Sequence, residues 1–416
     1  MTTHDSSPAA TIPLSFGEFV ALIAMLMALT ALSVDIMLPA LPAMAADFAI
    51  ADANDRQLVV TAYMLGFAGG MPLFGPLSDR FGRKPLLMIG LVIFVAASVG
   101  TLFADTYSSL LWLRAAQGLG SASPRVVGLA VVRDRFGGRD MARVMSFVMI
   151  VFIILPMIAP ALGSAVMLLG GWRMVFMALL VVGVVIAAWT QTRLPETRPA
   201  EAREPLSPRW LAHALHQTVT TRATLGYTIA TGFVFGPLLG YINSAQQIFI
   251  EVFDVGDLFP LFFAIIAGAL ALAAFMNGRL VMRVGMRTLA HAAVIGFVAI
   301  AAVHLSYLLV TDGPPPLWLF MALIAANLFC FGVMMPNFNA MAMEPLGLIA
   351  GTAASFIGAI TTAAGAIFGW YVGHLFDGTV IPLVAGYLVL GSLALVTVVI
   401  TERGRLFRPQ HAPQAG

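Results

Sequence analysis

Charge and cysteine are the scarcest features of this sequence of 416 residues. Asp, Glu, Lys and Arg together make up 10% of the chain, and Lys84 is its only lysine. Because Cys330 is the only cysteine, a disulfide bond within the chain is excluded. The formal net charge of +2 is too small to suggest a nucleic-acid partner.

The sequence also lacks the signatures of several kinds of site. It contains no cluster of metal ligands, no nucleotide-binding glycine loop and no nucleophile constellation. We therefore expect no catalytic residues, no metal ion and no cofactor. Since the chain has no site for ATP, we expect any uphill activity to draw on an ion gradient.

Long apolar runs are what the sequence has in abundance. Hydrophobic residues make up 60% of the chain and the mean hydropathy is +0.94, against roughly 45–50% apolar residues in soluble domains. A helix needs ~20 apolar residues to span a bilayer, and these runs are too long and continuous for barrel strands. The sequence therefore predicts an all-α membrane protein with twelve spanning helices. The predicted spans lie at about 16–40, 57–76, 86–104, 109–132, 144–168, 172–192, 223–250, 258–281, 287–310, 316–340, 347–374 and 379–401.

The longest polar stretch divides these spans into two groups of six. We expect a six-helix half at 1–192, a cytoplasmic linker at 193–222, a second six-helix half at 223–402 and a cytoplasmic tail at 403–416. An internal repeat supports this plan, because GRLVMRVGMR follows the eighth span as GPLSDRFGRK follows the second. Repeated halves of this kind place a binding site between them and alternate its access by rocking.

The basic residues predict the orientation of the chain. If the N-terminus is cytoplasmic, the inward connections hold 18 of the 22 Lys and Arg residues, whereas the outward side keeps only Arg56 and Arg173 together with nine acids. Cytoplasmic loops of membrane proteins carry this excess of basic residues. Both termini are therefore expected in the cytoplasm.

The decapeptide GPLSDRFGRK, residues 75–84, is unusually polar for this chain. It is predicted to form a tight cytoplasmic connection, with Gly75 and Gly82 allowing a short turn. A basic anchor would explain its arginines and its lysine, but such an anchor needs no acid. Asp79 therefore indicates a further role.

The decapeptide resembles the corresponding loop of the major facilitator superfamily of transporters. The resemblance implies that Asp79 latches the cytoplasmic side, bonding to the start of the eleventh span near Gly351 and Thr352 and to Arg133. The predicted cytoplasmic gate comprises Gly75, Asp79, Arg80, Gly82, Arg83, Arg133 and Asp134.

Two arginines lie in the fourth span, WLRAAQGLGSASPRVVGLAVVRDRF. Arg114 and Arg125 share a helical face with small residues, so this face is not expected to contact lipid. A mid-span arginine costs at least ~2.5–3.5 kcal/mol on insertion scales. Arg114 could instead snorkel to the outer interface, whereas Arg125, ~16 Å further along, is expected to face a central cavity.

Asp35 is the only acid well inside the first span, in ALSVDIMLPALP. Burial of a carboxyl group favours its neutral form and a nearby arginine favours the carboxylate, so these opposed effects suit proton coupling. We predict a proton-coupling site formed by Asp35, Arg114 and Arg125. The alternative is an interfacial acid wetted near Pro39.

Three motifs resemble proton-coupled drug exporters of the superfamily, and the first of them resembles the bicyclomycin- and chloramphenicol-resistance branch. They are SVDIMLPALP in the first span, RAAQGLG followed by VVRD in the fourth, and the fifth-span prolines Pro156 and Pro160 with Gly163. The resemblance implies protonation of Asp35 and carries over Arg114, Gln117, Gly118 and Asp134. The fifth-span motif is also common in membrane bundles as a bend with close packing.

Polar side chains at membrane depth are candidates for the substrate cavity, although hydrogen bonding between helices would explain them as well. The predicted cavity residues are Gln117, Tyr241, Asn243, Gln246 and Asn327. We expect a monomeric secondary transporter in the bacterial inner membrane that exports a small amphipathic compound in exchange for protons. The alternatives are a proton-coupled importer of a small metabolite and, disfavoured by the repeat, a non-transporting receptor or enzyme.

Overall fold

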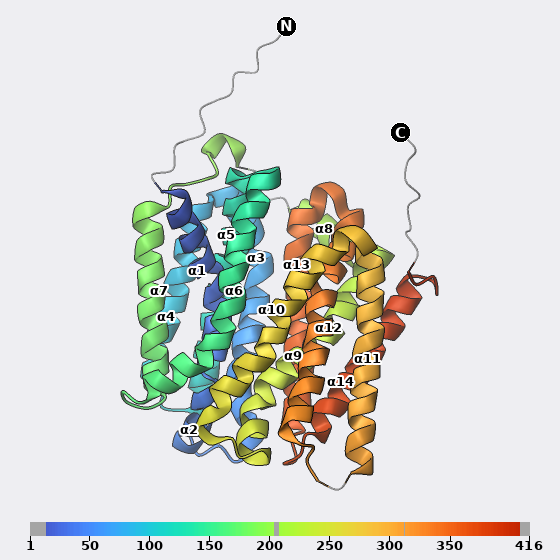
Figure 1. The fold of residues 1–416 in the computed structure, drawn as a ribbon. Coiled ribbons are helices and arrows are strands. Elements are labelled where there is room, and N and C mark those ends of the chain that lie inside the picture. The colour runs from blue at the N-terminus through green and yellow to red at the C-terminus, as the bar shows by residue number, and fades with distance from the viewer. Residues whose placement is uncertain (1–13, 204–207, 312, 408–416) are drawn as a thin grey trace.

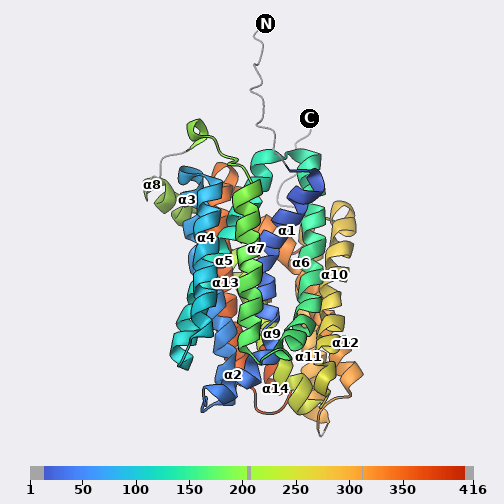
Figure 2. The same cartoon turned by 90° about the vertical axis from the view of Figure 1, so that its left-hand side faces the viewer.

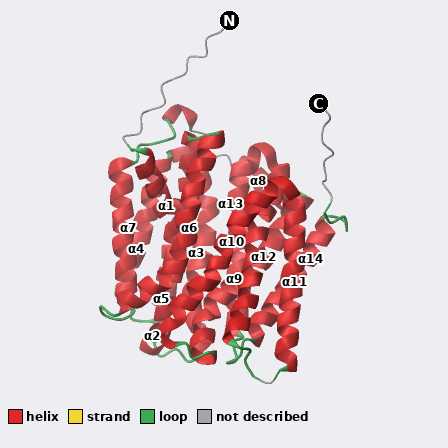
Figure 3. Ribbon diagram, in the orientation of Figure 1, coloured by secondary structure: helices red, strands yellow, loops and turns green. Residues whose placement is uncertain are grey.

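The computed structural model describes residues 14–203, 208–311 and 313–407. The predicted N-terminal tail, part of the linker and the end of the C-terminal tail include residues 1–13, 204–207 and 408–416, which lie outside the described residues. Within the described ranges the regular elements are helices, and no strand occurs (Figure 3). The predicted all-α fold is confirmed.

Twelve helices of 20 residues or more match the twelve predicted spans. They are α1 (Phe16–Asp35), α3 (Leu58–Phe81), α4 (Arg83–Leu102), α5 (Tyr107–Arg135), α6 (Gly138–Met167), α7 (Arg173–Arg193), α9 (Arg222–Gln247), α10 (Phe259–Val284), α11 (Met286–Val310), α12 (Leu317–Met343), α13 (Ala350–His374) and α14 (Ile381–Thr401). Among the described residues, eleven helices are long and apolar enough to cross a membrane. The remaining long helix, α5, has 29 residues but is much less apolar, because it carries the two arginines and several small polar residues.

The helices form two halves that lie side by side (Figures 1 and 2). One half contains α1 and α3 to α7, and the other contains α9 to α14. Both ends of the described chain lie at the same end of the bundle (Figure 1). We call this the inner end and the opposite one the outer end, following the predicted orientation.

Two pairs of helices join the halves. Helix α3 packs along α13, and α6 packs along α10. Glycines allow this close approach: a Cβ atom on Gly75 would lie only 2.8 Å from the Oγ atom of Ser355 in α13, and Gly358 lies against the side chain of Met71. The interface therefore depends on small residues at positions where the two halves meet.

The decapeptide is mostly helical, so the predicted turn at Gly75 is wrong. Helix α3 continues to Phe81, and α4 begins at Arg83. Only Gly82 departs from helical geometry, with φ of 101°, a conformation that favours glycine. The charged residues thus occupy the last turn of one helix and the first turn of the next, and Gly75 serves the contact with α13 instead.

The first predicted span is broken near its outer third. Helix α1 ends at Asp35, and a short 3-10 turn at Leu38–Ala40 leads into α2 (Leu41–Asp47). Pro39 explains the end of α1, because it lacks the N–H group that would bond to the carbonyl oxygen of Asp35 in a continuous helix. The break in the helix therefore places Asp35 at the end of α1, inside the bundle.

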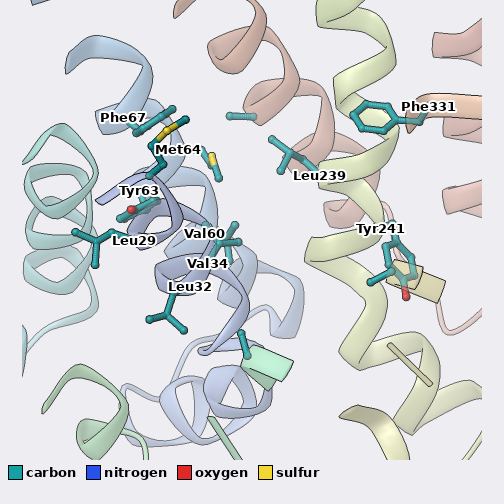
Figure 4. Packing of buried hydrophobic residues seen from close by; sticks show 14 of the residues in the cluster. Leu29, Leu32, Val34, Val60, Tyr63, Met64, Phe67, Leu239, Tyr241 and Phe331 are labelled. Carbon is teal, nitrogen blue, oxygen red and sulfur yellow. The ribbon is translucent and has the colours of Figure 1, made fainter. Parts of the chain in front are cut away.

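Buried side chains fill the interior of both halves. Figure 4 shows Leu29, Leu32 and Val34 of α1 close to Tyr63 of α3, with Tyr241 on α9 of the other half. These residues belong to one continuous cluster of buried hydrophobic side chains. The polar groups considered next are held in this apolar surrounding.

Candidate functional site

Asp35 is buried at the break in α1, with 4% of its surface exposed. No described residue forms a hydrogen bond or an ion pair with its carboxyl group. The carboxyl group lies close enough to the hydroxyl of Tyr241, on α9 of the other half, for the two to interact electrostatically. Asp35 therefore lies where the two halves meet.

The helix α6 packs directly on the break. Its chain continues as one helix through Pro156 and Pro160. A Cβ atom on Gly163 would collide with the carbonyl oxygen of Ile36, the residue after Asp35. The predicted fifth-span motif thus brings the backbone of α6 against the residue next to Asp35.

Arg114 is fully buried, so the alternative that it snorkels to the outer interface is wrong. Its guanidinium donates to the carbonyl oxygens of Val59 at 3.1 Å and Ser33 at 3.2 Å, and to Oε1 of Gln117. It also lies over the Tyr63 ring, 4.4 Å from the ring centre. Arg114 is therefore held by α1 and α3 and does not pair with Asp35.

Gln117 lies inside the N-terminal half rather than beside a shared cavity. It is fully buried, accepts from Arg114 and donates from Nε2 to Oγ of Ser98 at 2.7 Å. Its amide therefore connects α5 to α4. This placement differs from the predicted substrate-cavity role.

Arg125 occupies a different environment from Arg114. It is partly exposed, and its ζ carbon lies 4.9 Å from the centre of the Phe152 ring of α6. Among the described residues, the buried Nη1 atom has no hydrogen-bond partner. The structure therefore places Arg125 between α5 and α6, apart from the network around Arg114.

The polar residues predicted for the C-terminal half are all buried. Tyr241 stacks on Phe263 of α10 with a 5.7 Å separation of ring centres. The Tyr241 hydroxyl and the side-chain oxygens of Asn243, Gln246 and Asn327 lack a hydrogen-bond partner among the described residues. Buried polar groups seldom stay unsatisfied, so these oxygens can accept bonds from water or from a bound compound.

The predicted cytoplasmic gate forms a charge network at the inner end of the N-terminal half. Arg83 pairs with Asp79 at 2.8 Å and with Asp134 at 2.8 Å. Asp79 also pairs with Arg198, in the linker, at 3.0 Å. Arg80 is exposed and lies over the Phe81 ring.

The partners of Asp79 differ from the predicted ones. It pairs with Arg83 and Arg198, whereas the start of α13 is approached by Arg133: a Cβ atom on Gly351 would lie 3.3 Å from Nη1 of Arg133. Nothing in the sequence marks Arg198 as a partner of Asp79, because it lies in a polar linker that has no periodic pattern.

A second polar network, at the outer end, was not anticipated. Gln57 donates to Oε1 of Gln247 at 2.7 Å and to the carbonyl oxygen of Gly373 at 3.0 Å. Asn54 donates to the carbonyl oxygens of His374 and Phe376 and accepts from Gln247. Each of these bonds joins the N-terminal half to the C-terminal half.

Ion pairs extend the same outer network. Arg56 pairs with Glu251 at 2.6 Å, and Asp55 lies 3.5 Å from Nδ1 of His374. Arg56 is one of only two basic residues that the predicted topology puts outside, and this rarity is the one sequence signal that could have marked it. Its partner is 195 residues away, which a single sequence does not reveal.

Comparison with known proteins identifies the family to which this fold and these motifs belong. The sequence profile of the family described as Major Facilitator Superfamily matches residues 23–369. The chain belongs to this superfamily. It is a multi-pass membrane transporter and not an enzyme.

Several bacterial members of the superfamily are similar over nearly the whole chain. A "Bicyclomycin resistance protein homolog" of Haemophilus influenzae is 29% identical over 91% of this chain and 94% of its own length. An "Uncharacterized MFS-type transporter YdgK" of Bacillus subtilis is 28% identical, covering 91% of this chain and 92% of its own. The "Multidrug resistance protein MdtL" of Vibrio parahaemolyticus is 28% identical over 88% and 91%.

Solved structures of the superfamily share the fold. The xylose transporter XylE from E. coli, in a partially occluded inward open conformation, has a TM-score of 0.73 at 15% identity and covers 95% of this chain and 99% of its own. The human organic anion transporter MFSD10 has a TM-score of 0.67 at 16% identity, covering 93% and 100%. These similarities support the arrangement of helices alone.

The inner end of the C-terminal half of this superfamily member carries its own buried network. The Tyr227 hydroxyl donates to Oε1 of Glu402 at 2.5 Å and lies 3.2 Å from Nε2 of His291. Arg287, at the start of α11, pairs with Glu344 after α12 at 2.9 Å. The pair joins the start of α11 to the end of α12, as Arg83 and Asp134 join the start of α4 to the end of α5, although the repeat aligns Arg287 with Lys84.

Proposed function

We propose that this transporter exports a small amphipathic compound in exchange for protons by alternating access. The observation that carries the proposal is Asp35, a buried carboxyl group at the break in α1 with no hydrogen bond or ion pair among the described residues. The relatives named for bicyclomycin resistance and multidrug resistance favour an exporter of drug-like compounds.

The surroundings of Asp35 suit an exchange of proton for substrate. An ionised carboxylate without a partner is costly to bury, whereas a protonated carboxyl group is not. The proton therefore stabilises the packed arrangement in which α6 approaches Ile36 through Gly163. Loss of the proton favours a rearrangement that exposes the Asp35 carboxylate to water. Protonation of Asp35 is thereby linked to the relative position of the two halves.

The polar contacts between the halves support alternating access. Hydrogen bonds from Asn54 and Gln57 close the outer end across the interface. In the proposed cycle these bonds hold the state that faces inward and break when the outer end opens. Arg133 lies beside Gly351 and is proposed to belong to the inner gate, although it does not pair with Asp79.

We further propose that the protein lies in the bacterial cytoplasmic membrane as a monomer with both termini in the cytoplasm. The basic residues gathered in the inward connections support this orientation. Both ends of the described chain lie at the same end of the bundle, in agreement with an even number of spans (Figure 1). All proposed site residues come from one chain.

The test is transport in sealed proteoliposomes with an imposed pH gradient. Labelled bicyclomycin and a panel of cationic, neutral and zwitterionic compounds serve as probes. We expect wild type to accumulate at least one probe against its gradient, with movement opposite to that of protons. Movement in the same direction as protons would instead identify the importer and would contradict the proposed export.

The first prediction concerns Asp35 in this assay. Asp35→Asn keeps the shape of the side chain but removes the titrating group, so gradient-driven accumulation is lost while probe binding and downhill exchange remain. Asp105→Asn, which changes an exposed acid in the connection between α4 and α5, is the matched control and retains uphill transport. Undiminished pH-driven accumulation by Asp35→Asn would remove Asp35 from the mechanism.

A further inference from the structure

Two arginines lie within α5, and they differ in how their donors are satisfied. Arg114 is fully buried and donates to two backbone carbonyl groups and to Gln117. Arg125 lies against the Phe152 ring, and its buried Nη1 atom has no hydrogen-bond partner among the described residues. No carboxylate in the described part of the chain forms an ion pair with it. Arg125 is therefore a cation inside the bundle without a counter-ion.

The face of α5 that carries Arg125 reaches the other half at its inner end. Arg125, Leu129 and Arg133 follow one another at every fourth position, so they form a stripe along the helix. Arg125 is partly exposed, and Leu129 and Arg133 are exposed. Arg133 lies against Gly351 at the start of α13, which belongs to the C-terminal half. The stripe therefore meets the other half at Arg133 and becomes more accessible toward the inner end.

The chemistry of Arg125 selects the kind of group it can bind. The Phe152 ring makes a cation–π contact with the guanidinium of Arg125. The ring does not accept hydrogen bonds from the N–H groups that point outward in the plane of the guanidinium. The planar fork of donors matches a carboxylate or a phosphate, with two parallel hydrogen bonds. An aromatic ring beside the anionic group would find the apolar side chains of Phe152 and Leu129 nearby.

We propose that Arg125 binds an anionic group of the transported compound, of which an aromatic carboxylate is the simplest form. The proposal rests on the proposed function in one respect, since it takes the compound to bind between the halves. It narrows the substrate class to compounds with an anionic or zwitterionic character. Arg114, whose donors are all engaged by the protein, has no part in this binding.

The phosphate of a lipid headgroup presents similar chemistry to Arg125. We assign the anionic group to the compound because the stripe of Arg125, Leu129 and Arg133 reaches the other half at Arg133, which lies against Gly351 of α13. The experiment separates the two sources by comparing discs of digalactosyldiacylglycerol, an uncharged lipid without phosphate, with discs that contain phosphatidylglycerol. A lipid ligand would compete with the probe only in the second.

The test measures binding of three aromatic probes of the same shape to the purified full-length protein in such discs. The probes are 2-naphthoate, 2-naphthamide and 2-naphthylmethylammonium, which carry an anionic, a neutral and a cationic group. We expect wild type to bind the carboxylate about tenfold more tightly than the amide, because a bidentate pair replaces neutral hydrogen bonds. Arg125→Gln should lose this preference and keep its affinity for the amide.

Two further variants make the result specific. Arg125→Lys keeps the charge but not the planar fork and should retain part of the preference. Arg139→Gln removes a charge of the same sign at an exposed position near the start of α6 and should behave as wild type. The unchanged amide affinity of Arg125→Gln shows that this variant is folded.

The outcomes decide the proposal independently of proton coupling. A carboxylate preference that survives in Arg125→Gln, a wild type that favours the ammonium probe, or competition by phosphatidylglycerol that abolishes carboxylate binding would each overturn it. Binding is measured without a pH gradient, so Asp35→Asn should retain the carboxylate preference. Failure of the proposed export would therefore leave this measurement unaffected.

Discussion

The outer and inner ends of the interface between the two halves are held by different kinds of contact. At the outer end, Asn54, Arg56 and Gln57 form hydrogen bonds and an ion pair with the C-terminal half. At the inner end, the acids Asp79 and Asp134 pair with arginines of the N-terminal half and its linker. The described contacts between the halves at that end are packing contacts at glycines, such as Gly75 against Ser355.

This difference means that the interface between the halves favours the state that is closed at the outer end. A buried hydrogen bond contributes a net ~0.5–1.5 kcal/mol, and leaving a partner unsatisfied costs more than that. The outer bonds must all be exchanged for water when that end opens. Separation at the inner end leaves the charge pairs within each half intact. The contrast can be tested by changing one end at a time and measuring the separation of the halves.

The largest effect is expected from Gln57→Ala. Gln57 is fully buried and donates to both Gln247 and the Gly373 carbonyl group. Its loss leaves these acceptors without a donor in the closed state, at a cost of about 1–3 kcal/mol, which corresponds to roughly a 5- to 150-fold shift toward the state open at the outer end. Spin labels on cysteines at Ala51 and Asp257, in a Cys330→Ser background, report the separation by double electron–electron resonance.

The matched control for Gln57→Ala lies at the inner end. Ser355→Ala removes a buried hydroxyl group that packs against Gly75, with no hydrogen bond described for it. It should leave the outer distance distribution unchanged. Equal responses to the two substitutions would mean that the two ends do not differ as the contacts indicate.

A smaller effect is expected from the ion pair at the outer end. The Arg56 side chain is 7% exposed, whereas that of Glu251 is 47% exposed. Glu251→Gln leaves a buried arginine without its partner and should favour outer opening by about 1 kcal/mol, roughly fivefold. Arg56→Gln leaves a carboxylate that water can solvate, so its effect should be weaker. The same spin-label distances measure both, and the reverse order would contradict the burial argument.

The smallest effect is expected from Gly75→Ala at the inner end. The added Cβ atom would lie 2.8 Å from Oγ of Ser355, so α3 and α13 must move apart slightly or the hydroxyl must rotate. Because the serine rotamer can change, we expect a cost of less than about 1 kcal/mol. Thermal stability in detergent and inner-end label distances give the measurement. Gly75→Ala combined with Ser355→Gly should restore wild-type behaviour, and failure of this rescue would place the strain elsewhere.

Local sequence signals predicted the helices, because hydropathy over some twenty residues decides whether a segment spans the membrane. They also located Asp35 and both arginines of α5. Pro39 ends α1 at Asp35 for a reason that is readable in the sequence, although the prediction extended that helix to residue 40. The polar decapeptide was assigned to a loop because its charges cluster, yet these charges lie on the ends of α3 and α4.

The contacts between distant residues were beyond a single sequence. Gln57 and Gln247 are 190 residues apart, and nothing in either neighbourhood marks the other as its partner. Arg114 shows a related limit. An arginine with three acceptors from neighbouring groups has the same sequence pattern as one that snorkels to the interface, and only the packing of α1 and α3 separates the two.

The linker has a consequence for how the chain could be divided. Glu196 accepts hydrogen bonds from the backbone N–H groups of Arg83 and Lys84 at the start of α4, and Arg198 pairs with Asp79. Helix α8 (Pro208–Thr220), by contrast, packs on α13 and α9. Each side of the linker thus belongs to a different half. A transporter made as two polypeptides, ending at residue 203 and starting again at residue 208, should assemble by complementation, whereas a division before Glu196 should deprive α4 of its cap and assemble poorly.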